Sequence, residues 1–356
     1  MKKQTLALLE KLTQLDGVPG FEEEVRRFMQ AELEGVAEFE TDNLGSLVCK
    51  KAGKSKSPKI IVPAHMDEIG FMVKDITEGG YIRFAQLGYW LDQTLLGHVV
   101  SVKTRKGELD GVIGCRPPHM TPPDQRDKVV KKDTMFIDIG AKDRDEAREL
   151  GVRVGDPIIP REPFRRLGDG KHLLSKAWDD RVGCALIIDM LKGLKGASHP
   201  NTVYGVGTTQ EEVGTRGAKT AAEVVDPDLC IVLDVGIATD TPGIEGEAKI
   251  ELGKGPVIYV LDAGTIAHHR FTDLILDVAE KKKIPHQVGL MERGATDARS
   301  IHVHSRGVPS TSLCIPARYI HSHAGVIHAD DYDATLELLI EAVKALTAAK
   351  TRAIRN

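Results

Sequence analysis

Helical and strand-like patterns alternate toward both ends of the chain. Apolar residues recur at helical spacing over 6–12, 21–33 and 332–346, and the continuous apolar run 60–62 predicts a buried strand that ends at His65. From residue 179 onward the two patterns follow one another. We expect helices over 182–191, 218–224 and 271–281 and strands over 202–207 and 229–235. This alternation predicts an α/β domain in which helices cover a sheet.

Residues 69–164 have a different pattern. Short alternating runs are separated by Gly, Pro and charged turns, and only 143–150 has helical spacing; the runs are 99–102, 111–114, 135–139 and 154–159. Many short strands with such turns are typical of a small β-barrel or sandwich. We therefore expect one α/β domain built from residues 1–68 and 165–356, with a β-rich domain, 69–164, inserted into it.

Composition narrows the class of protein. Of the 356 residues, 41% are hydrophobic and 28% are charged, which is typical of a globular protein and excludes a disordered chain. The formal charge of -4, without any basic block, argues against nucleic acid as a partner. No apolar run reaches the roughly 18 residues of a membrane helix. The five cysteines form no C-x-x-C pair, so we expect reduced thiols and a cytoplasmic protein.

Acids and histidines stand where the predicted strands end. His65 ends one apolar run, and Asp67, two residues later, can hold the second ring nitrogen of a metal-binding histidine. Asp234 ends the run 229–233, and His321 follows the run 313–315. Since open sheets place ligand sites at one edge, we expect these side chains to converge. Taken alone, the His65 pair is more typical of an ordinary surface or core histidine.

Two pairs of adjacent acids complete the candidate set. Asp179 and Asp180 open a predicted helix, so one can cap the helix while the other points into a cleft. Glu211 and Glu212 follow the predicted strand, and on an extended segment they would point in opposite directions, one toward a metal and one toward water. In isolation, the first pair is explained simply as a helix cap, and an exposed acidic loop explains the second pair equally well.

Charge balance and missing motifs favour a two-metal site. Asp179, Glu212 and Asp234 with one hydroxide carry four negative charges, which would neutralise two divalent cations. The chain has neither the H-E-x-x-H helix of mononuclear zinc proteases nor a G-x-S-x-G nucleophile elbow.

Ordered motifs along the chain resemble those of a known family. They occupy 64–70, 176–183, 210–217, 234–236, 296–298 and 318–322. The chain resembles, essentially from end to end, the dinuclear metalloaminopeptidases that assemble into tetrahedral dodecamers, the group including glutamyl and deblocking aminopeptidases. The resemblance implies a mixed-sheet, zinc-peptidase-like α/β catalytic domain, and it implies that the inserted β-barrel is a PDZ-like dimerisation domain.

The resemblance also implies roles for single residues. Asp179 would bridge two divalent metal ions; His65 and Asp234 would complete one site, and Glu212 and His321 the other. Glu211 would be the general base, and Asp67 would orient His65.

The implied reaction removes the N-terminal residue of a short peptide. A metal-bridged water attacks the peptide carbonyl, and the base carries the proton to the leaving amine. The family commonly uses zinc or cobalt, and the ligand set also accepts manganese. Dimers assembling into a homo-oligomeric dodecamer are implied as well.

Four positions depart from the family's pattern. Trp178 stands where a smaller aliphatic residue or Phe is expected. Arg293 and Ala295 replace glycines in a loop near the substrate side-chain pocket, where an arginine could pair with an acidic N-terminal residue. His323 replaces a residue that is often proline, so His321 or His323 could reach a metal; the Arg-Tyr-x-His-Ser context favours His321.

Two other functions fit parts of the pattern. Glu211 with Asp179 could be the acid and base of an endoglucanase-like glycoside hydrolase, although only 4% of the chain is aromatic. A non-catalytic, metal-stabilised assembly could use the same ligands, but it gives Glu211 no role beside Glu212. Chelation would separate these functions from a peptidase, which should lose activity and recover it with metal.

Overall fold

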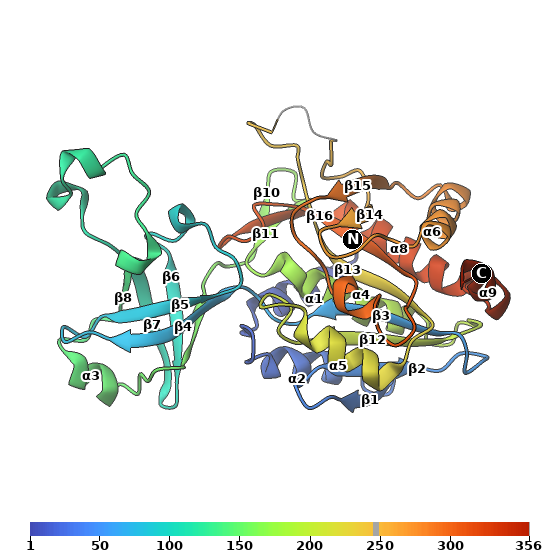
Figure 1. Ribbon diagram of the computed structural model, residues 1–356, viewed down its shortest axis with the longest axis horizontal. Helices are drawn as coiled ribbons and strands as arrows, with labels where there is room; N and C mark the ends of the chain where they lie inside the picture. Colours follow the sequence, from blue (N-terminus) through green and yellow to red (C-terminus); the bar gives the residue numbers. More distant parts are fainter. Residues whose placement is uncertain (245–248, 356) are drawn as a thin grey trace.

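Two bodies of regular structure lie side by side in the computed structural model, which describes residues 1–244 and 249–355 (Figure 1). The larger body is a mixed eleven-stranded sheet flanked by helices, and the smaller is a closed β-barrel. The predicted fold class, an α/β domain with an inserted β-barrel, is therefore confirmed.

The large sheet has the strand order β1-β2-β12-β3-β13-β16-β17-β11-β10, and β14 pairs with β15 and β16. Strand β3 runs parallel to β12 and β13, and β13 runs parallel to β16. The strands are β1 (Glu38–Thr41), β2 (Leu47–Lys51), β3 (Lys59–His65), β10 (Arg165–Leu167), β11 (His172–Ser175), β12 (Thr202–Thr208), β13 (Leu229–Ile237), β14 (Val257–Asp262), β15 (Gln287–Met291), β16 (Ser310–Arg318) and β17 (Gly325–His328).

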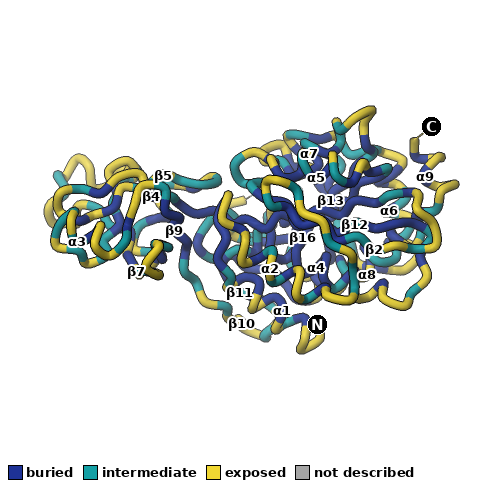
Figure 2. The backbone as a smooth tube through the Cα atoms, turned by 90° about the horizontal axis from the view of Figure 1, so that it is seen from below, coloured by how far each residue is buried: buried dark blue, intermediate teal, exposed yellow. Residues whose placement is uncertain are grey.

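Helices cover both faces of this sheet. They are α1 (Lys3–Gln14), α2 (Glu23–Glu32), α4 (Trp178–Gly193), α5 (Arg216–Val225), α6 (His269–Lys282), α7 (Ala298–Ile301), α8 (Ala329–Ala345) and α9 (Ala348–Arg355). Successive residues of a strand face opposite sides, so Ile60 and Val62 enter the core under α1, α4 and α8, while Ile61 enters the core under α5 and α7. The central strands are therefore buried along nearly their whole length (Figure 2).

The barrel closes in the order β4-β5-β8-β7-β6-β9. Its elements are β4 (Gly70–Ile76), β5 (Ile82–Leu87), β6 (Val99–Thr104), β7 (Gly107–Gly114), β8 (Phe136–Asp138), α3 (Arg144–Glu149) and β9 (Pro157–Pro160), with short 3-10 turns at 92–94, 118–120, 123–125 and 132–134. It has its own core, in which Phe71 stacks on Trp90. These strands lie inside the predicted insertion, 69–164, and its dimerisation role stays a prediction.

The chain enters and leaves the barrel next to the candidate residues. Strand β3 ends at His65, and the barrel begins five residues later with β4. After β9, the hairpin β10–β11 returns the chain to the edge of the large sheet and leads into α4. The insertion therefore separates His65 from Asp179 in sequence, while the fold brings both to one sheet edge.

Candidate metal centre

The five predicted ligands converge where the parallel strands end. His65, Asp179 and Asp234 form one group, and Asp179, Glu212 and His321 form a second; within each group, the potential ligand atoms lie within 4.8 Å of one another. Asp179 belongs to both groups. The geometry therefore matches the arrangement of two adjacent metal sites that share one carboxylate, although the ligand roles themselves stay proposals.

His65 is held from both ring nitrogens. Its Nε2 lies 2.8 Å from Oδ1 of Asp179, and its Nδ1 lies 2.9 Å from the main-chain carbonyl oxygen of Asp67. The Asp67 carboxylate is 3.6 Å from Nδ1, too far for a good hydrogen bond. Asp67 thus contacts His65 through its backbone rather than through the side chain that the sequence suggested.

The Asp67 carboxylate instead holds the loop that carries the two glutamates. It is fully buried, and its two oxygens accept hydrogen bonds from the backbone N–H groups of Glu211 and Glu212, each at 3.0 Å. The spacing of His65 and Asp67 predicted that this carboxylate would hold the histidine ring. It could not show that a loop 144 residues away would use that acid as its anchor.

The expectation that Glu211 and Glu212 lie on an extended segment is wrong. Strand β12 ends at Thr208, and Gln210 has a φ of 55°, in the left-handed region, so the chain enters a turn at the glutamates. The buried Glu22 carboxylate stabilises this turn by accepting the N–H of Gln210 at 3.0 Å. Glu22 is a site-supporting residue that the sequence analysis missed, and no pattern around it signals this contact.

The two aspartates that open α4 divide their roles as expected. The buried Asp180 accepts the N–H of Gly183 at 3.0 Å, as a capping residue does, while Asp179 reaches His65 and His321. Asp234, by contrast, does not end its strand, because β13 continues to Ile237. Its side chain still lies at the cluster, since it occurs at the position of β13 that faces Asp179 and His65.

His321, and not His323, belongs to the cluster. Its Nε2 lies 3.6 Å from Asp179 Oδ2 and 3.9 Å from Glu212 Oε2. His323 is buried elsewhere, with its ring stacked on that of His98 in the barrel at a centroid distance of 3.7 Å. The alternative that sequence left open is thereby decided by position.

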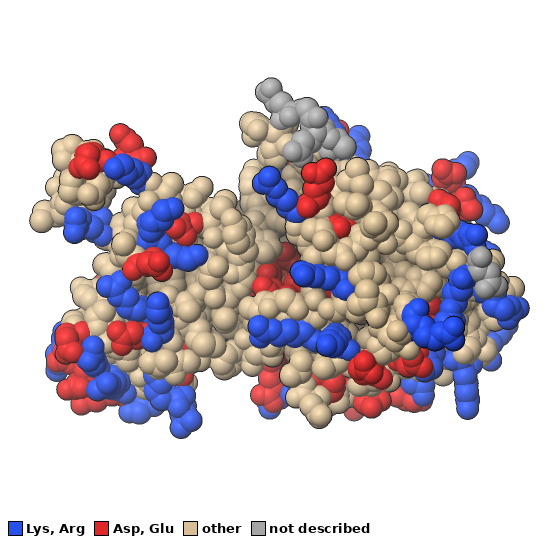
Figure 3. All heavy atoms as spheres, viewed as in Figure 1, with Lys and Arg blue, Asp and Glu red and all other residues tan. Residues whose placement is uncertain are grey.

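The inserted barrel contributes to the centre, which the sequence did not reveal. Nδ1 of His321 lies 2.8 Å from the main-chain carbonyl oxygen of Tyr89, in the loop after β5. The neighbouring Gly88 approaches so closely that a Cβ placed there would lie 3.0 Å from Glu212 Oε2 and 2.5 Å from Ile69. Acidic side chains are visible in the recess between the two bodies on the face shown in Figure 3.

Burial and crowding shift the pKa values of the clustered acids. Burial raises the pKa of Glu211, Glu212 and Asp234 well above the usual values, and neighbouring carboxylates raise it further. Burial would also raise the pKa of Asp179, but the hydrogen bond and charge of His65 outweigh it and lower that pKa. The cluster therefore concentrates more negative charge than its single buried histidine can compensate.

The donor set suits divalent transition metals. Oε1 of Glu212 is buried and has no hydrogen-bond partner among the described residues, which is costly for a carboxylate unless a cation lies beside it. Imidazole nitrogens together with carboxylates suit zinc, cobalt or manganese. The side chains present therefore fit a pair of such ions.

Two of the departures from the family's pattern have clear positions. The Trp178 indole is buried behind Asp179, where its Nε1 donates to the carbonyl of Gly325 at 3.2 Å and its ring packs edge-on against Phe164. Trp178 therefore fills space behind the cluster and does not replace a ligand. Arg293 is exposed in the loop after β15.

Comparison with known proteins identifies the family. Residues 45–338 match the family described as M42 glutamyl aminopeptidase. A TET aminopeptidase structure from a marine-sediment archaeon of the Thaumarchaeota superposes with a TM-score of 0.97 at 41% identity, covering 99% of both chains. The lysyl aminopeptidase of Pyrococcus furiosus is 35% identical over 348 residues, which are 95% of this chain and 97% of that protein.

A third similar protein bears on assembly. A structure of the Pyrococcus horikoshii TET1 peptidase, described as assembling into a tetrahedron or a large octahedral shell, matches with a TM-score of 0.87 at 33% identity and covers 96% of this chain and all of that one.

Together, the fold and these similarities identify the chain as a metal-dependent peptide hydrolase. It belongs to the M42 glutamyl aminopeptidase family.

This membership confirms the predicted family and the prediction of an aminopeptidase, and it favours that function over the glycoside hydrolase and the non-catalytic assembly. The helices within residues 1–244 and 249–355 are all too short or too polar to span a lipid bilayer.

Proposed function

We propose that the chain removes N-terminal residues from short peptides with a pair of divalent metal ions, zinc or cobalt, bound at the sheet edge. The observation that carries the proposal is the position of Asp179, whose carboxylate is shared by the His65–Asp234 and Glu212–His321 groups. A two-metal hydrolase can use such a shared carboxylate to hold both ions, and a neighbouring acid that is not a ligand can carry the proton. Glu211 would be that acid.

Each remaining residue has a role that follows from its contacts. Glu211 is half-buried at the cluster, and desolvation together with the charges of Asp297 and Asp234 raises its pKa well above the usual value. A carboxylate of raised pKa is suited to take a proton and to return it to the leaving amine. The Asp67 side chain fixes where Glu211 stands because it holds the N–H groups of Glu211 and Glu212.

The metal ions supply Lewis acidity, which polarises the peptide carbonyl and lowers the pKa of a water molecule. The protein contributes the rest: it fixes His65 through Asp67, fixes His321 through Tyr89, and keeps the proton carrier adjacent to a ligand.

The adjacent glutamates provide a matched pair of variants. We expect Glu211→Gln to keep two metal ions per chain and to lower kcat by about 10²–10⁴-fold, because only the proton carrier is lost. We expect Glu212→Gln, with the same change of shape and charge one residue away, to lose metal as well. Metal content by mass spectrometry and peptide hydrolysis test this. Full turnover by the first variant would remove Glu211 from the role of base.

Chelation followed by adding back single metals would identify which ion the protein uses. We expect chelation to abolish hydrolysis, and zinc, cobalt and manganese to restore it to different extents when each is added alone. Hydrolysis that persists after complete metal removal would contradict the two-metal proposal.

The preferred substrate is a separate question, because the family is described as glutamyl aminopeptidase while the Pyrococcus furiosus relative is a lysyl aminopeptidase. We propose that the exposed Arg293 favours an acidic N-terminal residue by charge pairing. Arg293→Ala should then lower kcat/KM for glutamyl peptides more than for leucyl peptides. An equal effect on both would remove Arg293 from substrate selection.

Assembly and location complete the proposal. The likeness to TET1 supports a homo-oligomer, and we propose dimers joined through the barrel that build a tetrahedral dodecamer. All five cysteines are unpaired, which fits a reducing cytoplasm. Light scattering should give the mass of twelve chains; the mass of a single chain would refute the assembly.

A further inference from the structure

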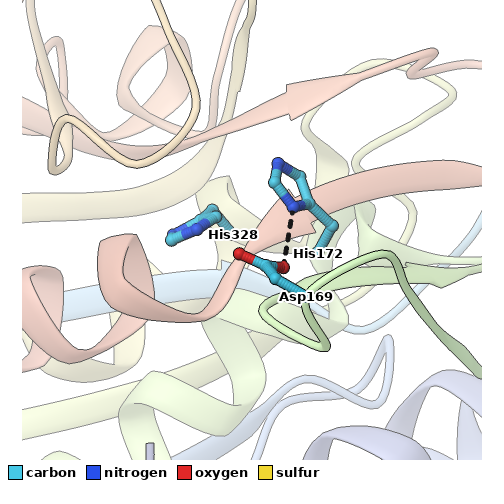
Figure 4. Close-up of side chains that lie close together, drawn as sticks. All are labelled: Asp169, His172 and His328. Carbon is cyan, nitrogen blue, oxygen red and sulfur yellow. Dashed lines mark hydrogen bonds and ion pairs between the residues drawn. The ribbon is translucent and has the colours of Figure 1, made fainter.

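A second group of ligand-type side chains lies away from the proposed active site. Asp169, His172 and His328 each offer one ligand atom, and these atoms lie within 4.8 Å of one another. Figure 4 shows Asp169 and His172 on one hairpin, with His328 across from them on the neighbouring strand. Nothing in the proposed aminopeptidase mechanism uses these three residues.

Strand pairing brings the two histidines together. Strand β11 runs antiparallel to β17, and His172 is directly opposite His328 in their register. Their rings lie 4.9 Å apart, nearly perpendicular to each other. Asp169, in the β10–β11 turn, lies 3.3 Å from Nδ1 of His172. The backbone therefore sets the separation of the histidines, so little rearrangement is needed to bind an ion.

From this donor set we infer a third metal site, separate from the dinuclear centre, that binds a divalent transition ion such as zinc, nickel or copper. Two imidazoles with one carboxylate favour these ions over magnesium and calcium, which prefer oxygen ligands. A fourth coordination position would be filled by water, because the site lies at the surface.

The surroundings allow a cation to bind. The ammonium group of Lys171, in the same turn, is paired with the Asp330 carboxylate at 2.7 Å, which offsets part of its charge. Nδ1 of His328 accepts a 3.2 Å hydrogen bond from the N–H of Asp330 at the start of α8. Metal binding by His328 would replace this long hydrogen bond, which caps α8.

The site lies at the opposite end of the β11–β17 ladder from the proposed active site. At that other end, Ser175 pairs with Gly325. Asp179 follows Ser175 by four residues, and His321 precedes Gly325 by four. A metal ion bound by His172 and His328 would link two elements. One is the β10–β11 hairpin, which returns the chain from the barrel, and the other is strand β17, which follows His321.

Zinc stoichiometry tests the site. Tag-free protein is dialysed against low-micromolar zinc, and bound metal is counted by mass spectrometry. We expect wild type to hold one more zinc per chain than His172→Asn or His328→Asn; asparagine at position 328 can still cap α8. Asp169→Asn, in an exposed turn, provides a variant whose folding should not suffer, and it should weaken zinc binding at least tenfold.

Two controls make the result specific. His119→Asn changes an exposed histidine in the barrel and should leave the zinc count unchanged. Asp179→Asn should lose the ions of the active site but keep the third, so failure of the proposed function and failure of this inference give different counts. Equal zinc in wild type and in all three cluster variants, or an equal loss in His119→Asn, would overturn the inference.

Discussion

The two clusters of histidines and acids are built in opposite ways. The active-site cluster (His65, Asp179, Glu212, Asp234 and His321) gathers residues from the end of β3, the start of α4, the turn after β12, the interior of β13 and the loop before β17, and a barrel carbonyl contacts it. Burial raises the pKa of Glu212 and Asp234 well above the usual values. The hairpin cluster comes from one hairpin and its neighbouring strand. Its histidines meet because of strand register alone.

The two kinds of cluster differ in how strongly they destabilise the fold. Burying several carboxylates together destabilises the fold unless cations or hydrogen bonds compensate them, and such arrangements persist mainly at functional sites. A partly exposed cross-strand pair costs little and requires no supporting shell. The active-site cluster should therefore be sensitive to changes in its supporting residues, whereas the hairpin cluster should affect metal count but not turnover.

The largest effect should follow loss of the shared carboxylate. Asp179→Asn is expected to lower kcat/KM by about 10³-fold or more, because both ion sites lose a charged ligand. Asp169→Asn, the same substitution in the hairpin cluster, should leave kcat/KM within twofold. Equal losses in both variants would erase the distinction between the two clusters.

The second-largest effect should follow a change at Gly88, where the barrel contacts the active-site cluster. Gly88→Ala is expected to lower activity about 10–100-fold, because the new methyl group would press on Ile69 and on the Glu212 carboxylate. Gly97→Ala is the matched control: Gly97 has nearly the same φ, 79° against 78°, but no atom within 4 Å of a Cβ. If both variants lose activity equally, backbone strain and not contact with Glu212 is the cause.

The loop anchor should have a somewhat smaller effect. Asp67→Asn leaves one oxygen acceptor for two N–H groups, so we expect about a tenfold loss of kcat with metal content retained. Asp42→Asn provides the comparison, because a single oxygen of Asp42, Oδ1, accepts the N–H groups of Leu44, Gly45 and Ser46, and asparagine keeps that oxygen. It should leave kcat and metal content unchanged.

The smallest effect should come from Glu22, and it should appear as pH dependence. Burial and the nearby Asp67 raise the pKa of Glu22 to about 7, above its ordinary value of 4.5. The folded protein therefore binds this proton more tightly than the unfolded chain, so ionising Glu22 destabilises the fold as pH rises from about 4.5 to 7.

Glu22→Gln keeps an oxygen that can accept the N–H of Gln210 but cannot ionise. Between pH 5 and pH 8, the free energy of unfolding should fall less in the variant than in wild type, by up to about 3 kcal/mol. Denaturant unfolding at both pH values measures this. Identical falls would show that Glu22 ionises as freely in the folded protein as in the unfolded chain.

The sequence predicted correctly those elements whose apolar residues recur with a regular period. Apolar periodicity predicted α1, α4 and α8, and the change of pattern after residue 69 predicted the barrel. It missed β14, β15 and the hairpin β10–β11. The exposed strand β10 gives no apolar alternation, whereas β14 is mostly buried and its apolar run 257–261 was a signal that the analysis did not use.

The α/β domain, the inserted barrel, the family and a set of candidate metal-binding residues could all be predicted from the amino-acid sequence. The folded structure was needed to show that the Asp67 carboxylate holds a loop, that Tyr89 and Gly88 of the barrel reach the active-site cluster, and that His321 lies there instead of His323. These contacts join backbone groups or distant strands. A backbone carbonyl or amide is the same at nearly every position of a sequence, and only folding gives it a neighbour.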